Sequence, residues 1–350
     1  MWEQTEARTF HENLSALMDI LDGKGRPSEA ATLAAWQTFF FVVPVVSTTF
    51  ASADKLFGGL GRESLGWLFV DEAGQAPPQY AVGALWRVRR AVIVGDPLQL
   101  KPVVTLPRGG QRALAREFGV GEQWSPSRTS VQQVADRLAE YGTALPGLDS
   151  DEPVWVGTPL RVHRRCDRPM FSISNQIAYD GLMVFGTPDH PAFRDRDVWC
   201  DIRSATSNEH WIPAEGHELR SLLSQLRRAG VDAEEIRVIS PFLVVVSEAM
   251  KAHESVFPEV SGRNREQWVG TVHTKQGKEA DVVILVLGGN PDRPGARWFA
   301  TREPNLLNVA VTRAKRRLYV IGNRDTWGNE PYFNVLAARI PAGHPAPDTG

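Results

Sequence analysis

Short runs of apolar residues, rich in Val and Ile, recur along the chain, and each ends abruptly in polar or small residues. Their apolar character is continuous rather than alternating, which is typical of strands buried on both faces in a parallel sheet covered by helices. We therefore predict strands at VVSTT (Val45 to Thr49), WLFVDE (Trp67 to Glu72), AVIVGD (Ala91 to Asp96), IRVISP (Ile236 to Pro241), VGTVHT (Val269 to Thr274), DVVILVLG (Asp281 to Gly288) and LYVIGN (Leu318 to Asn323).

Segments with helical periodicity lie between these runs. The clearest is HELRSLLSQLRRAG, in which four leucines recur at the spacing of one helix face and Gly230 is placed as a C-cap: Leu219, Leu222, Leu223 and Leu226. Alternation of strands and helices predicts the α/β class, in which ligands bind beyond the carboxyl ends of the strands.

A turn-rich stretch, Thr105 to Pro153, separates two groups of predicted strands. We place a domain boundary near Asp149 to Val156, which gives a first domain at residues 1–150 and a second at 151–340. The last ten residues, PAGHPAPDTG, have the composition of a flexible tail.

Composition narrows the class of protein only slightly. A chain of 350 residues has room for about two domains, and 42% hydrophobic with 23% charged residues is ordinary for a globular protein. The net charge of −2 neither favours nor excludes nucleic acid, because local patches carry phosphate binding. Two cysteines, no signal-peptide pattern and no apolar run long enough for a bilayer predict a soluble cytoplasmic protein. We expect the eleven tryptophans to lie mainly in the core.

Two carboxylates, Asp71 and Glu72, directly follow a predicted strand in LFVDEAGQAPP. An Asp at a strand end can hold Mg²⁺ through water, and a neighbouring Glu can orient and deprotonate an attacking water. The next strand ends similarly, on Asp96, and is followed by Gln99, whose neutral amide can hydrogen-bond a terminal phosphate. The simpler alternatives are a solvated acidic loop and an ordinary turn with a surface Gln.

Cationic side chains gather in the predicted second domain. LRVHRRCDRP contains four arginines, Arg161, Arg164, Arg165 and Arg168, and Arg313, Lys315, Arg316 and Arg317 come just before the last predicted strand. Arginine suits a developing phosphoryl charge because its planar fork is always ionised. A basic helix face that is merely solvated is the alternative. Between them, Gln276 and Gly277 form a turn where backbone can approach a ligand, and Glu279 can accept from a ribose hydroxyl; an ordinary turn before a strand is the alternative.

Taken in order, STTFASA, LFVDEAGQA, VGDPLQLKPVV, HRRCDRP, ISPF, TVHTKQGKEAD and LNVAVTRAK resemble the consecutive motifs of superfamily 1 nucleic-acid helicases. The likeness is strongest to the branch that includes the nonsense-mediated-decay RNA helicases and the replication-associated nuclease-helicases, and it extends from Val45 to Asn323. It implies two RecA-like P-loop NTPase domains that bind ATP and Mg²⁺ between them and move along single-stranded DNA or RNA.

The resemblance also implies roles for individual residues. Asp71 matches the acid that holds Mg²⁺, Glu72 the hydrolytic base, Gln99 the γ-phosphate sensor, and Arg165 and Arg313 the two arginine fingers. Five further residues are implied in binding the nucleotide: Asp96, Arg164, Gln276, Gly277 and Glu279. Another five are implied in contacting the backbone of the nucleic-acid strand: Ser47, Thr48, Thr49, Thr271 and Thr274. Contacts to the phosphates position the strand without reading its sequence.

The chain departs from the family pattern in two places. Arg164 stands where the family has an aromatic residue near the adenine, although an arginine can also stack on a base. The phosphate loop GxxxxGK[ST] is absent ahead of STTFASA; the nearest approach, Asp22 to Gly25, lacks the spacing and the following Ser or Thr. The first RecA-like domain is therefore expected to be incomplete at its N-terminus, with an N-terminal segment or a partner supplying the loop that cradles the phosphates.

Two functions from different classes remain open. One is the C-terminal portion of an ATP-dependent helicase or translocase. The other is a degenerate helicase-like subunit that binds nucleic acid or protein without hydrolysing ATP. Retention of the acid pair, Gln99 and both arginines favours the first, and the missing loop favours the second. A nuclease has little support, because no further cluster of carboxylates and lysines is present.

Overall fold

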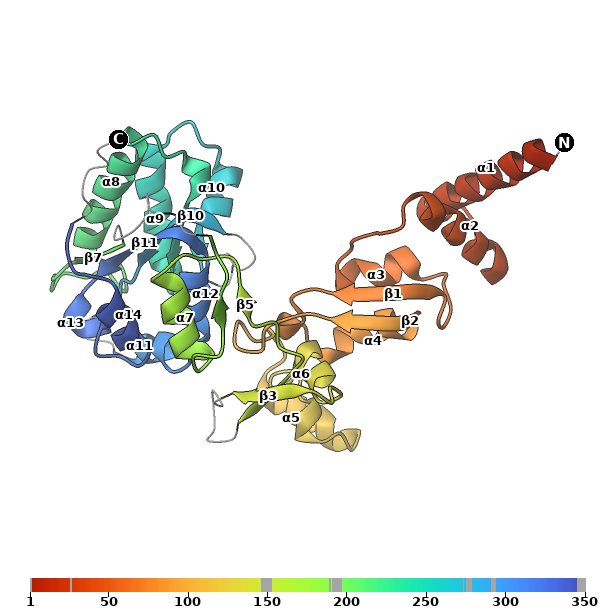
Figure 1. Cartoon of the computed structure of the whole chain (residues 1–350), viewed down its shortest axis with the longest axis horizontal. Coiled ribbons are helices and arrows are strands. Elements are labelled where there is room, and N and C mark those ends of the chain that lie inside the picture. Colours follow the sequence, from red (N-terminus) through yellow and green to blue (C-terminus); the bar gives the residue numbers. More distant parts are fainter. Residues whose placement is uncertain are drawn as a thin grey trace. The chain divides into compact units, whose positions relative to one another are not determined.

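The computed structural model (Figure 1) describes residues 2–25, 27–145, 153–188, 190, 197–272, 274, 279–290 and 294–344. The chain divides into two compact units. Unit 1 comprises Met1–Pro97 and Lys101–Leu138, and unit 2 comprises Leu98–Leu100 and Ala139–Gly350. The predicted boundary near Asp149 lies partly outside the described residues and stays a prediction, as does the flexible tail, of which residues 345–350 are not described.

Unit 1 begins with two helices, α1 (Trp2–Leu21) and α2 (Glu29–Val42), which pack through a small core that contains Leu17, Ala35 and Trp36. The Ser28 hydroxyl accepts from the Ala31 amide and so caps α2. Two parallel strands follow, β1 and β2, and their neighbours are helical. The bounds are α3 (Phe50–Phe57), β1 (Leu65–Val70), α4 (Pro78–Trp86), β2 (Val88–Ile93), α5 (Arg108–Glu117) and α6 (Val131–Asp136).

The prediction of a strand at Val45 to Thr49 is wrong. Residues 43–49 have no regular secondary structure, and Thr49 begins α3 as its N-cap residue. β-branched residues favour an extended backbone, but a strand also needs a neighbour to accept its hydrogen bonds. In the part of unit 1 that is described, β1 and β2 pair only with each other.

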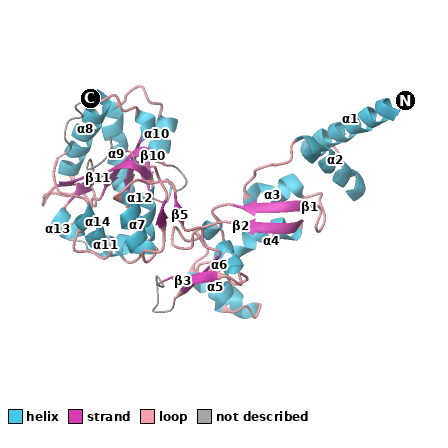
Figure 2. Ribbon diagram, in the orientation of Figure 1, coloured by secondary structure: helices cyan, strands magenta, loops and turns pink. Residues whose placement is uncertain are grey.

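Unit 2 is built on a sheet of five parallel strands in the order β7-β11-β10-β8-β9. Figures 1 and 2 show α8, α9 and α10 on one side of this sheet and α7, α11, α12 and α14 on the other. The strands are β7 (Val198–Asp201), β8 (Ile236–Ser240), β9 (Val269–Thr271), β10 (Ala280–Val286) and β11 (Ala314–Gly322). The helices are α7 (Met170–Ala178), α8 (Pro213–Arg228), α9 (Leu243–Val256), α10 (Gly262–Trp268), α11 (Pro294–Thr301), α12 (Asn305–Thr312), α13 (Arg324–Trp327) and α14 (Phe333–Arg339).

Two small strand pairs complete unit 2. β3 (Gly142–Leu145) pairs antiparallel with β4 (Val154–Gly157), and β5 (Val162–His163) pairs in parallel with β6 (Val184–Phe185). β5 leads directly into the arginine-rich segment that the sequence singles out.

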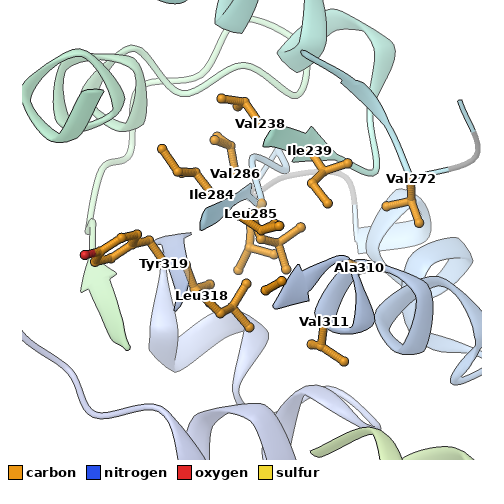
Figure 3. Close-up of a cluster of buried hydrophobic side chains, with 14 of the residues drawn as sticks. Val238, Ile239, Val272, Ile284, Leu285, Val286, Ala310, Val311, Leu318 and Tyr319 are labelled. Carbon is orange, nitrogen blue, oxygen red and sulfur yellow. The ribbon is translucent and has the colours of Figure 1, made fainter. Parts of the chain in front are cut away.

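The core of unit 2 lies on both faces of the sheet, as continuous apolar strands require. Figure 3 shows side chains of β8, β10 and β11 meeting Ala310 and Val311 of α12. Helix α8 confirms its predicted pattern, because its four leucines are at most 3% exposed and Gly230 follows it with a φ of +81°. The predicted α/β class is therefore confirmed.

Among the described residues, the helices are too short or too polar to cross a lipid bilayer.

Candidate active site

The acid pair of unit 1 lies directly beyond the carboxyl end of β1. Glu72 has φ 54° and ψ 36°, the left-handed conformation that costs a non-glycine residue about 1–2 kcal/mol. The Asp71 Oδ1 atom accepts from the Glu72 amide at 2.9 Å, and Gln75 Nε2 donates to Glu72 Oε2 at 3.1 Å. These bonds hold the bend that follows the strand at Asp71 and Glu72.

The segments that follow β1 and β2 lie against each other. A Cβ atom on Gly74 would sit 2.6 Å from the Asp96 carbonyl oxygen, and one on Gly95 would sit 2.6 Å from the Gly74 nitrogen. The Ala73 amide donates to the Val94 carbonyl at 3.0 Å. Both glycines are therefore needed for this close approach, which places the backbone of Asp96 beside the loop that follows the acid pair.

Gln99 and Arg313 are in contact within unit 2. Arg313, 1% exposed, donates from Nη2 to Gln99 Oε1 at 3.4 Å and from Nε to the Val309 carbonyl at 3.3 Å. The backbone around Gln99 is held by α12, because Asn308 Nδ2 donates to the Leu98 carbonyl at 3.2 Å and Asn305 Nδ2 donates to the Gln99 carbonyl.

Arg165 forms an ion pair with Glu279, with 2.8 Å between Nε and Oε2. Both side chains are 41% exposed, so solvent weakens the pair and leaves the guanidinium accessible to a ligand. The residues come from different segments: Arg165 follows β5, and Glu279 precedes β10.

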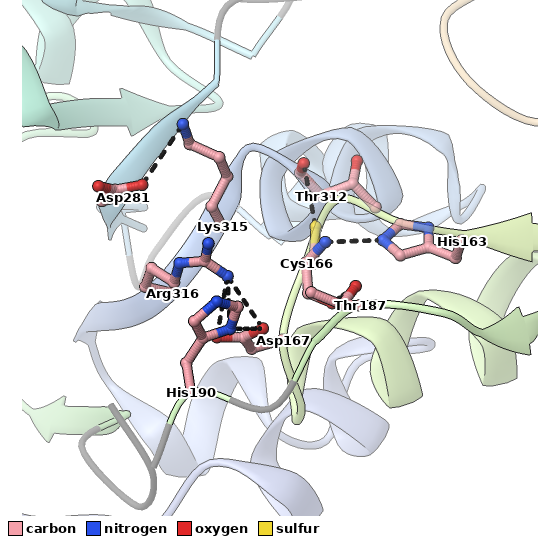
Figure 4. Close-up of polar contacts among 9 residues, drawn as sticks. All are labelled: His163, Cys166, Asp167, Thr187, His190, Asp281, Thr312, Lys315 and Arg316. Carbon is pink, nitrogen blue, oxygen red and sulfur yellow. Dashed lines mark hydrogen bonds and ion pairs between the residues drawn. The ribbon is translucent and has the colours of Figure 1, made fainter. Parts of the chain in front are cut away.

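The buried thiol of Cys166 connects these two arginine segments. Its Sγ donates to the Thr312 carbonyl at 3.3 Å, as Figure 4 shows, and Thr312 directly precedes Arg313 in the sequence. Burial raises the pKa of Cys166 to about 12, while the charges of Arg165 and Arg313 lower it and that of Glu279 raises it. The thiol therefore stays protonated, and all three charged groups lie close enough to influence it.

The remaining predicted residues are spread over both units. Arg164 is exposed beside Arg165. Thr271 is buried, and its hydroxyl accepts from the Thr274 amide at 3.3 Å, while Thr274 is exposed. Ser47, Thr48 and Thr49 are exposed in the segment before α3. Gln276 and Gly277 lie outside the described residues.

A divalent cation would have few protein ligands here. Among the described residues, no three His, Cys, Asp or Glu side chains gather as a metal cluster. Asp71 is exposed at a strand end, and Mg²⁺ commonly binds one or two carboxylates while keeping several waters. The residues present therefore fit a water-mediated Mg²⁺ but not a fully protein-bound metal.

Several residues that build this arrangement were missed in the sequence. Asn308 accepts from the Ser174 hydroxyl at 2.6 Å and donates to the Tyr179 hydroxyl at 3.0 Å, so it joins α7 to α12. Asp167 forms an ion pair with Arg316, with 3.1 Å between Oδ1 and Nη1, and the same Oδ1 lies 3.1 Å from His190 Nδ1 (Figure 4). A buried Asn in the apolar helical run NLLNVAVT was an available signal for the first; the Asp167 cluster has no local signal.

Comparisons with known proteins agree with the motif order. Two family profiles, both described as AAA domain, match residues 160–325 and 3–106, and together they cover most of the chain. A regulator of nonsense transcripts 1 homolog from Arabidopsis thaliana is 23% identical over 287 residues, which is 77% of this chain and 20% of that protein. The DNA replication ATP-dependent helicase/nuclease DNA2 of Gallus gallus is 25% identical over 270 residues, 75% of this chain and 23% of that protein. The chain thus spans about a fifth of the length of these relatives.

A solved structure of Arterivirus nonstructural protein 10, a helicase, is similar at 17% identity and a TM-score of 0.34 over 73% of this chain and 39% of that one. The parallel sheet and the matched profiles define a RecA-like NTPase fold. Within that class, the chain belongs to the superfamily 1 nucleic-acid helicases.

Proposed function

We propose that this chain carries the hydrolytic and strand-moving part of an ATP-dependent helicase or translocase that acts on single-stranded nucleic acid. The observation that carries the proposal is the gathering of four predicted site residues in unit 2. Gln99, Arg165, Glu279 and Arg313 come from four separate segments, and each contacts another member of the set. A solvated basic helix face gives no reason for these segments to converge.

In this proposal each residue has one task. Glu72 orients and deprotonates the attacking water, and Asp71 holds Mg²⁺ through water; when bound, the ion neutralises charge on the phosphates. Arg165 and Arg313 stabilise the charge that develops on the γ-phosphoryl group. Gln99 senses the γ-phosphate, and its hydrogen bond from Arg313 links that arginine to the sensor.

The strained backbone of Glu72 supports its assignment. Left-handed non-glycine residues persist where surrounding contacts hold them, and they cluster at active sites. The chain offers a matched comparison in Glu63, which is also left-handed, with φ 55°, but precedes β1 instead of following it.

Because the 350 residues contain no GxxxxGK[ST], no lysine of that motif reaches the β- and γ-phosphates. We expect the chain by itself to bind ATP weakly and to turn it over at least about a hundredfold more slowly than the ~10 s⁻¹ typical of enzymes. Radioactive phosphate release, measured with and without single-stranded DNA or RNA, tests this expectation.

Any residual turnover should rise with the single strand, fall at least tenfold in Glu72→Gln, and stay unchanged in Glu63→Gln. A rate of ATP turnover that Glu72→Gln leaves unchanged would refute the assignment of Glu72 as the base. Fast strand-stimulated turnover that Glu72→Gln abolishes would instead show that the phosphate-loop argument is wrong.

The alternative is a helicase-like subunit that binds nucleic acid or protein without hydrolysis, and the missing motif favours it. It predicts strand binding whose affinity is the same with and without millimolar ATP. A nucleotide-dependent change in strand affinity would support the motor.

A further inference from the structure

A side chain closes the turn that carries both Arg164 and Arg165. The Cys166 amide donates to His163 Nε2 at 3.0 Å, so the imidazole of the last β5 residue bonds the backbone three residues further on. Figure 4 shows His163 reaching Cys166 in this way. Because Nε2 accepts a hydrogen bond, the neutral ring carries its proton on Nδ1.

Cys166, whose amide makes this bond, is held in unit 2 by several further contacts. Its side chain is fully buried, its carbonyl accepts from the Thr187 hydroxyl at 3.0 Å, and its thiol bonds the Thr312 carbonyl. The next residue, Asp167, donates its amide to the Lys315 carbonyl at 2.8 Å. The C-terminal end of the turn is therefore anchored to the segment around Arg313, and His163 anchors its N-terminal end to the same point.

The surroundings of His163 favour its neutral form. Burial, and then the positive charge of Arg165, lower the pKa of His163. The ring packs against the uncharged ring of Phe171 in α7, with 5.4 Å between centroids, and Phe171 in turn packs on Phe185 of β6, over which Arg168 lies. The nearby carboxylate Glu279 pairs with Arg165.

We propose that neutral His163 is a positioning residue for Arg165, and that protonation of its ring opens the turn and releases the arginine from its working position. A protonated imidazole carries hydrogens on both nitrogens, so it can no longer accept from the Cys166 amide. The turn would then lose its side-chain closure while Arg165 gains a like charge two residues away. The site thereby acquires a proton-controlled switch. This inference rests on the proposed function for its meaning, but its structural content is tested without any activity.

The direct test is the hydrogen exchange of the Cys166 amide, followed by NMR on the whole chain from pH 7.5 to pH 5 and corrected for intrinsic exchange. Protection should fall about fivefold or more on acidification, with a midpoint below the ordinary histidine pKa because burial and Arg165 lower the pKa of His163, and it falls because the protonated ring no longer accepts from the amide. The Arg165 Nε–H resonance should change with the same midpoint. Protection that stays constant over this range would overturn the proposal, as would a ring proton found on Nε2 at pH 7.5.

Two variants separate the acceptor from the ring. His163→Gln supplies a carbonyl oxygen that does not titrate, so it should keep the protection and lose its pH dependence. His163→Phe keeps an aromatic ring against Phe171 but has no acceptor, so protection should be low at every pH. If His163→Phe protects the amide as well as the wild type does, the proposal is wrong.

A matched control is His11→Gln, which replaces an exposed histidine of α1 and should leave the profile unchanged. A second arm measures the affinity of a fluorescent ATP analogue across the same pH range; it should weaken on acidification in the wild type and not in His163→Gln. No binding even at millimolar analogue would count against the proposed function, while the Cys166 protection still decides the role of His163.

Discussion

Glu72 has a strained, left-handed backbone, and its side chain is proposed as the base that activates the attacking water. Asn tolerates the left-handed region better than Glu does. We predict that Glu72→Asn raises the free energy of unfolding by roughly 0.5–1 kcal/mol while removing any ATP turnover. Urea unfolding measures the first effect, and phosphate release the second.

Glu63→Asn is the control for this trade-off, because Glu63 has nearly the same φ but no assigned role. It should give the same gain in stability with no loss of turnover. A gain in Glu63→Asn without one in Glu72→Asn would mean that the contacts of Glu72 outweigh its strain.

The two arginines differ in burial, and their removal should differ accordingly. Arg313→Met leaves the buried Val309 carbonyl and Gln99 amide oxygen without this donor, at a cost of about 1–3 kcal/mol. Arg165→Met breaks only a half-exposed ion pair, at a cost below about 1 kcal/mol. Equal midpoints in urea unfolding would contradict this ranking.

At the scale of elements, the end of α8 offers a clean test of backbone conformation. Gly230 has a positive φ, and nothing lies within 4 Å of the Cβ that an alanine would add. Gly230→Ala should therefore destabilise unit 2 by roughly 1 kcal/mol through the backbone alone. Thermal unfolding would measure the loss.

Gly262, the first residue of α10, is the matched control. It also has open space around its Cβ position, but its φ is not positive. Gly262→Ala should stabilise the protein by about 0.5–1 kcal/mol, because alanine favours the helix and limits the unfolded chain. The same sign of effect at both glycines would contradict the argument.

The strands that the sequence predicted correctly are those with long apolar runs, such as β10 and β11. The strand expected at Val45 to Thr49 failed because its composition favours extension but cannot supply a neighbour. The short β7 was missed because four residues give too little pattern for an assignment. The tryptophans were only partly predicted: Trp199 and Trp327 are buried, whereas Trp67 and Trp298 are 56% and 61% exposed.

For the candidate site, motif order indicated which residues matter but not which of them touch. The pairing of Arg165 with Glu279 and of Arg313 with Gln99 joins segments far apart in the sequence, and only the folded sheet brings them together. The role of His163 depends on a side-chain bond across a turn of four residues, which leaves no periodic signal.

At the scale of the whole molecule, two buried carboxyl groups make stability depend on pH. Burial raises the pKa of Glu215 to about 8 and that of Asp197 to about 7. Between the unfolded value near 4 and these folded values, the folded chain binds protons that the unfolded chain does not, so the free energy of unfolding falls as pH rises. Burial lowers the pKa of His253 to about 4, which has the opposite effect, but mainly below about pH 7.

Above about pH 7 the histidine contribution is small, because an unfolded histidine is then largely neutral as well. From there to pH 8 stability should decrease by up to about 1.4 kcal/mol per pH unit for each carboxyl group that is still protonated in the folded chain. Glu215→Gln keeps an oxygen for the Gly288 amide and should remove the share of this slope that Glu215 contributes, leaving the share of Asp197. Glu117→Gln, at an exposed position of α5, should leave the slope unchanged. Urea midpoints at four pH values decide the matter, and a slope that Glu215→Gln leaves unchanged would show that Glu215 is not one of its sources.

Three residues of the first half of the chain, Leu98 to Leu100, belong to unit 2 although the residues on both sides belong to unit 1. Leu98 and Leu100 are 1% and 6% exposed in the core of unit 2, and α12 holds the backbone between them. An expression boundary drawn after Leu138 would therefore produce a unit 2 with a hole in its interior and without the Gln99 side chain that accepts from Arg313. For that unit to fold well, Leu98 to Leu100 must be supplied again, either fused to it or added as a separate peptide.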